Sequence, residues 1–190
     1  LFFAWHHGAE ATGQFGLALM IMALPMALLG HTIGQAYYAE IAKVGRKRPE
    51  EIYRITRGIT RKLFWISVPP FLILLLSGPW LFQLVFGDVW RPAGVFASIM
   101  SVYLLTQFVS SPIVSALNVF GKQTYYFQMN LLRVGFMVAP FLAGWWLELS
   151  QAWTLVLYSL SMSALRFYLY FKIMAIIREQ PPGGPAAGPP

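Results

Sequence analysis

The sequence predicts an all-α fold, a polytopic integral membrane helical bundle with five transmembrane helices and the stub of a sixth. Of the 190 residues, 57% are hydrophobic and only 11% are charged, whereas soluble domains average about 45–50% and about 25%. The apolar residues also gather in long stretches, and a helix needs roughly 20 of them to cross a hydrocarbon core of about 30 Å. Composition and pattern together exclude an ordinary soluble enzyme.

The predicted spans follow one another with short connections. They cover residues 13–41, 63–86, 92–120, 124–147 and 152–171, within one helical domain over residues 1–180. Residues 1–5 resemble the stub of a helix that starts upstream, so we expect a longer protein. Residues 181–190 are only Pro, Gly and Ala and predict a disordered tail. Turn residues such as Gly87-Asp88 and Gly121-Lys122 predict antiparallel neighbours.

Proline interrupts several of these spans. It removes a backbone donor and bends a helix, as is common around the polar interior of transporters, although inert kinks also occur. The interrupting residues are Pro25, Pro69, Pro70, Pro112 and Pro140.

The basic residues are distributed asymmetrically. Eight of the 14 lie in one long connection, residues 42–62. Helix alternation puts Lys122, Lys172 and Arg178 on the same side, whereas the opposite loops contain only Arg91. This asymmetry predicts a cytoplasmic location for the basic loop 42–62 and for the C-terminus. It accounts for the net charge of +7 without a nucleic-acid partner, and it leaves open whether the loop also contacts anionic membrane lipids.

Two arginines are predicted inside spans, where an ionisable side chain points to function. Arg133 lies eleven residues after Lys122, roughly half of the core thickness, and shares a helix face with Asn130. It either contacts an anion in a cavity or makes a structural hydrogen bond between helices. Arg166 lies six residues before Lys172, close enough to the headgroups to snorkel, and is otherwise a second cavity residue.

A polar stripe runs along the third predicted span at steps of four, four, four and three residues. This spacing is one face of one helix. Such a face either lines a water-filled cavity or supplies hydrogen bonds between helices. Its members are Tyr103, Gln107, Ser111, Ser115 and Asn118.

Several chemistries have no candidate residues. The chain contains no Cys, which excludes disulfides and thiolate metal sites. No Asp or Glu lies deep in a predicted span, so a buried proton relay has no candidate. The sequence also lacks a third ligand near His6 and His7, a phosphate-binding loop and a catalytic signature. We therefore expect no metal, no cofactor and no enzyme activity.

Several short motifs resemble those of bacterial polysaccharide flippases. The resemblance covers about residues 8–178, and the motifs that carry it are Gly13-Gln14-Phe15-Gly16-Leu17-Ala18, Leu24-Pro25, Gly30, Gln35, Gly78-Pro79-Trp80-Leu81-Phe82, Val85-Phe86-Gly87-Asp88-Val89-Trp90, Ala93-Gly94, Ser110-Ser111-Pro112 and Gly121-Lys122-Gln123. The chain is similar to the C-terminal half of a lipopolysaccharide or O-antigen flippase of the multidrug/oligosaccharidyl-lipid/polysaccharide exporter superfamily.

This resemblance implies a two-lobed protein that moves lipid-linked oligosaccharide across the bacterial inner membrane by alternating access. Its expected partners are membrane lipids, the lipid-linked oligosaccharide and the glycan-assembly machinery. Two alternatives stay open. One is a drug or peptidoglycan-precursor exporter of the same superfamily, and the other is an integral-membrane glycan polymerase or acyltransferase.

Overall fold

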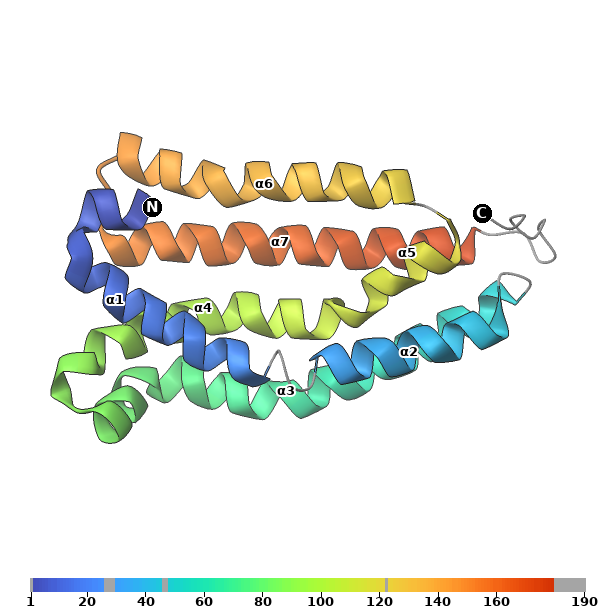
Figure 1. Cartoon of the computed structure of the whole chain (residues 1–190), viewed down its shortest axis with the longest axis horizontal. Coiled ribbons are helices and arrows are strands. Elements are labelled where there is room, and N and C mark those ends of the chain that lie inside the picture. Colours follow the sequence, from blue (N-terminus) through green and yellow to red (C-terminus); the bar gives the residue numbers. More distant parts are fainter. Residues whose placement is uncertain (1, 26–29, 46–47, 122, 180–190) are drawn as a thin grey trace.

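The computed structural model describes residues 2–25, 30–45, 48–121 and 123–179, and within these ranges the chain is helical and contains no strand (Figure 1). This confirms the all-α prediction. The predicted tail, residues 181–190, lies outside the described residues. The helices are α1 (Phe2–Pro25), α2 (His31–Val44), α3 (Pro49–Phe86), α4 (Arg91–Ser110), α5 (Ala116–Val119), α6 (Gln123–Trp146) and α7 (Gln151–Arg178), with the 3₁₀ turns η2 (Asp88–Trp90) and η3 (Pro112–Ser115).

Four helical segments of the described chain are long and apolar enough to cross a membrane. They are Pro49–Phe86, Asp88–Val119, Thr124–Trp146 and Gln151–Arg178, whereas the apolar helix Thr12–Ala23 is shorter. The predicted single span 13–41 is not confirmed, because its described residues belong to two helices, α1 and α2, and residues 26–29 lie outside the described ones. The 14 residues of α2 extend only about 21 Å and expose polar residues such as Gln35 and Glu40. The predicted stub forms the start of α1, before a turn at Gly8, whose φ of 84° favours glycine.

The basic segment 42–62 is not a loop, which corrects the sequence prediction. Residues 42–44 end α2, and residues 49–62 begin α3. At 38 residues, α3 is about 57 Å long, nearly twice the hydrocarbon thickness. Its start has Pro49 at the first position and Glu50 and Glu51 in the first turn, all favourable at a helix N-terminus. Arg54, Arg57, Arg61 and Lys62 therefore lie on the same helix as the apolar part that follows them. Lys43 lies on α2 and Arg48 precedes α3, whereas Arg46 and Lys47 lie outside the described residues.

The long helices run side by side, with α4 in the middle of the bundle (Figure 1). α4 packs between α3 and α7, and α6 packs on the other side of α7. α1 covers part of α4, and α2 covers η3 and the first half of α3. One buried cluster surrounds Met100 and Met162, and a second surrounds Ile113 and Ile173. The segment containing α4 is the most buried of the four long ones, whereas α3 and α6 expose most of their apolar surface.

Glycine sets the distance between α3 and α4. A Cβ atom added to Gly94 would lie 2.6 Å from the Cα of Pro79, and one added to Gly78 would lie 2.6 Å from the carbonyl oxygen of Gly94. Small residues allow such close approach of helix backbones. Both glycines belong to the motifs on which the resemblance rests, so these motifs mark a helix crossing in this fold.

Two of the predicted proline bends have visible consequences. Pro112 cannot donate a backbone hydrogen bond, and the chain passes from α4 into the 3₁₀ turn η3 at this residue. Pro140 lies inside α6 and frees the carbonyl of Phe136, four residues earlier. The Ser161 hydroxyl of α7 donates to this carbonyl across 3.4 Å. This hydrogen bond links the Pro140 region of α6 to α7.

A buried hydrogen bond joins α2 to the basic part of α3. The hydroxyl oxygens of Tyr37 and Thr56 are 2.7 Å apart, and both side chains are fully buried. Thr56 already donates to the carbonyl of Ile52, so Tyr37 is the donor in this pair. The contact fixes α2 against the first half of α3.

Candidate functional site

A polar cavity of about 370 Å³ has three walls. One is formed by the end of α4, η3 and α5, the second by α6 and the third by α7. Seven of the eight predicted site residues line it, although they come from three separate parts of the chain. Apolar residues, among them Leu117, Met129 and Leu169, complete the wall. The seven are Gln107, Ser111, Ser115, Asn118, Asn130, Arg133 and Arg166.

The polar stripe forms one wall of this cavity. It was predicted on a single helix, but the helix is interrupted at Pro112 and the stripe crosses from α4 through η3 into α5. Its last four members nevertheless stay on the cavity side. Tyr103 is the exception, because it is buried in the core and its ring stands edge-on to that of Tyr158 at 5.8 Å. The stripe therefore lines a cavity from Gln107 onward.

The opposite walls come from α6 and α7 and supply the charge. Arg133 of α6 is exposed, whereas the Arg166 side chain of α7 is only 9% exposed. Asn130 donates its amide to the carbonyl of Tyr126 at 3.2 Å, which leaves its side-chain oxygen as an acceptor. The cavity thus has two cationic groups on adjacent helices.

Neither arginine forms an ion pair with a described residue. Among the residues that the structure describes, the ion pair is Arg48–Glu51, at the start of α3 and exposed to solvent. Arg133 forms no hydrogen bond to another helix in the described chain, so of its two predicted roles the structure supports a cavity position. Arg166 is 9% exposed and lines the same cavity. A cavity with uncompensated cations favours an anion or well-ordered water.

An unpaired polar atom also lies in the wall. The side-chain oxygen Oε1 of Gln107 is buried, and no described residue donates to it. A buried acceptor without a donor costs about 1–3 kcal/mol, and native structures rarely keep one without a water or a ligand. Gln107 therefore offers an acceptor to whatever occupies the cavity.

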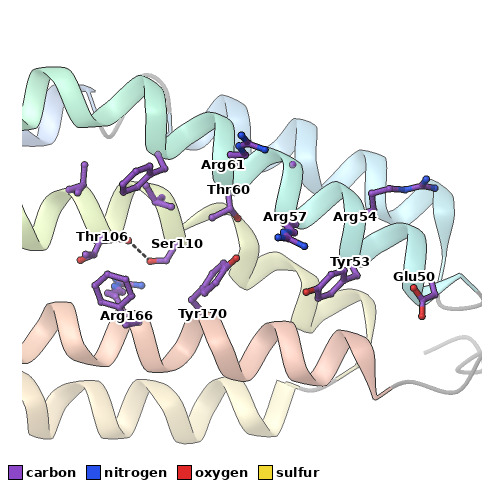
Figure 2. A pocket seen from close by; sticks show the side chains of 15 residues that line it. Glu50, Tyr53, Arg54, Arg57, Thr60, Arg61, Thr106, Ser110, Arg166 and Tyr170 are labelled. Atoms are coloured by element: carbon purple, nitrogen blue, oxygen red, sulfur yellow. Dashed lines mark hydrogen bonds between the residues drawn. The ribbon is translucent and has the colours of Figure 1, made fainter.

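A second and larger hollow, the basic groove, lies between α3, α4 and α7 (Figure 2). Its volume is about 1020 Å³, and Arg166 lines it as well as the polar cavity. Arg54, Arg57 and Arg61 of α3 face it together with Tyr53. Sequence analysis missed this group because it treated residues 42–62 as a loop. The signal was the spacing of three and four residues, which puts all three arginines on one helix face.

Comparison of the chain with models of protein families, with curated proteins and with solved structures found no match. The geometry therefore carries the functional interpretation. Long apolar helices surround a polar, cationic cavity with an unpaired acceptor, and a basic groove adjoins it. This combination describes a helical protein, compatible with a membrane location, in which polar and cationic side chains line a cavity.

Proposed function

We propose that this chain forms one lobe of a transporter that moves lipid-linked oligosaccharide across the bacterial inner membrane by alternating access. The observation that carries the proposal is the cavity itself. Seven polar side chains from α4–α5, α6 and α7, two of them cationic, line one hollow between apolar helices; Arg166 is buried, whereas Ser111, Asn118 and Arg133 are exposed. Polar groups at membrane depth are expensive and mark substrate pathways.

Each part of a lipid-linked sugar has a complementary part in this arrangement. Its diphosphate pairs with Arg133 and Arg166, since guanidinium groups bind phosphate oxygens through paired donors. Its sugar hydroxyls meet the amides and hydroxyls of Gln107, Ser111, Ser115, Asn118 and Asn130. The polyprenyl chain stays outside, along the exposed apolar surfaces of α3 and α6.

The charge distribution supports an orientation. The α2–α3 junction, the end of α5 and the end of α7 lie together at one end of the bundle (Figure 1). The first half of α3 brings its arginines to that end, whereas Arg91 begins α4 at the other. We assign the basic end to the cytoplasm by the positive-inside rule. Glycan-assembly enzymes then meet the transporter at this end.

The test replaces Arg133 in the complete protein and measures surface glycan. Arg133→Ala should reduce export strongly while the protein is inserted and folded at its normal level. Arg133→Lys should retain part of the activity, because it preserves the charge but loses the paired donors. Arg91→Ala is the matched control, since Arg91 is also an exposed helical arginine but lies at the opposite end.

Normal glycan export by Arg133→Ala would overturn the proposal. If instead the variant lost efflux of a cationic drug and kept glycan export, the drug exporter of the same superfamily would replace it. Loss of glycan polymerisation with an intact supply of exported precursor would indicate the membrane enzyme.

A further inference from the structure

The basic groove has the composition of a binding site for a lipid headgroup. Its cationic residues are Arg54, Arg57 and Arg61 from α3, and Arg166 from α7, which lies at the end away from the single carboxylate, Glu50 (Figure 2). No ion pair or hydrogen bond to another described residue engages these four guanidinium groups. The positive-inside rule explains why basic residues gather at this end of the bundle. It does not explain why four of them line one hollow.

The hydroxyl groups of the groove restrict what the anion contacts. Thr60, Thr106 and Ser110 each donate to a carbonyl of their own helix, at 2.7–2.8 Å. Their oxygens therefore remain acceptors only, and the donors for an anion are the arginines and the tyrosines Tyr53 and Tyr170. A ligand with phosphate oxygens and its own hydroxyl groups satisfies both sets.

The groove is also apolar at the end away from Glu50. Phe64 of α3, Leu105 and Val109 of α4 and Phe167 of α7 line it there. On α3 this change falls between Arg61 and Phe64, where the basic part of the helix meets its apolar part. A ligand that fills the groove thus has a charged head and an apolar body. Inorganic phosphate or a soluble sugar phosphate would leave the apolar part empty.

We propose that the basic groove binds an anionic glycerophospholipid, with its phosphate on Arg57 and Arg61 and its first acyl segment along Phe64 and Phe167. The glycerol hydroxyls of phosphatidylglycerol match the free acceptors of the groove, whereas the ammonium group of phosphatidylcholine is repelled by the arginines of α3. The inference requires a membrane location but not the proposed cargo of the polar cavity.

The test titrates the complete, detergent-solubilised protein with dioleoyl phosphatidylglycerol and with dioleoyl phosphatidylcholine, and counts bound lipid by native mass spectrometry. We expect at least tenfold tighter binding of phosphatidylglycerol. Each basic residue near an anionic lipid contributes about fivefold in affinity, so the double variant Arg57→Gln/Arg61→Gln should weaken binding about 30-fold. Lys62→Gln is the matched control, because Lys62 is an exposed cation beside Arg61 that does not line the groove.

Three results would overturn the proposal. They are equal binding of the two lipids, an equal loss in Lys62→Gln, and displacement of phosphatidylglycerol by glycerol phosphate at a similar concentration, which would indicate a site for soluble phosphates. The comparison of lipids on the unmodified protein needs no folded variant. Because Arg57 and Arg61 do not line the polar cavity and Arg133 does not line the groove, failure here is distinguishable from failure of the proposed cargo.

Discussion

Replacing Gly94 with alanine should force α3 and α4 apart. The added Cβ would lie 2.6 Å from the Cα of Pro79, about 0.8 Å closer than ordinary van der Waals contact. The opposing atoms belong to the backbone of α3, so no side chain can rotate away. The helices must separate, and α4 is the helix that carries Gln107 to the polar cavity.

The expected loss follows from two opposing effects. Overpacking of a close contact costs about 1–3 kcal/mol, and the overlap with backbone puts Gly94→Ala at the upper end. Alanine returns up to about 1 kcal/mol through its better helix propensity. The net destabilisation is about 2 kcal/mol, which corresponds to a fall in Tm of roughly 4–8 °C for a protein of this size.

Gly135→Ala is the matched control. Gly135 is also inside a long helix, but a Cβ there would meet nothing within 4 Å. Its Tm should stay level or rise, because only helix propensity changes. The chain has seven Trp and no Cys, so tryptophan fluorescence during heating is the suitable assay. A Gly94→Ala protein that melts at or above the wild type would refute the close crossing of α3 and α4.

Two further substitutions separate structural from functional polar groups. Gln107→Leu should leave Tm unchanged or raise it by 2–4 °C, since it removes an unpaired buried acceptor that costs about 1 kcal/mol. The same substitution should reduce glycan export. A fall in Tm of several degrees would instead indicate that Gln107 has a structural role. Tyr37→Phe should lower the free energy of unfolding by about 1 kcal/mol through loss of its buried hydrogen bond, as followed by tryptophan fluorescence, whereas Tyr38→Phe, at an exposed position, should have no effect.

Helices that repeat an apolar pattern over many residues could be predicted from the sequence. α6 and α7 start at Gln123 and Gln151, close to the predicted 124 and 152, because turn residues mark these ends. The basic segment 42–62 could not be separated from a loop by hydropathy alone, since a solvated helix and a solvated loop are equally polar. The signature of Pro49 followed by two acidic residues would have placed the start of α3.

The cavity was predicted better than the helix that carries part of it. A periodicity of four puts side chains on one face of a regular helix, and the prediction assumed that regularity from Tyr103 to Asn118. The break at Pro112 is local, so Gln107, Ser111 and Ser115 still point to one side. Tyr103 lies a turn deeper, where α7 packs closely and Tyr158 covers its ring. Such packing depends on a distant helix, and spacing within one span cannot reveal it.

Arg166 connects the two hollows and sets a condition on both. Arg166 is only 9% exposed, and a charge taken out of water loses several kcal/mol of hydration, for which a buried partner normally compensates. Among the described residues, the carboxylate that lines the basic groove with Arg166 is that of Glu50, and it lies at the opposite end of the groove from Arg166 (Figure 2). The compensating charge or water must therefore enter through the polar cavity or through the basic groove. An anion in either hollow would reduce the electrostatic attraction for an anion in the other. The two sites should therefore bind their anionic ligands with negative cooperativity, although they are separate sites.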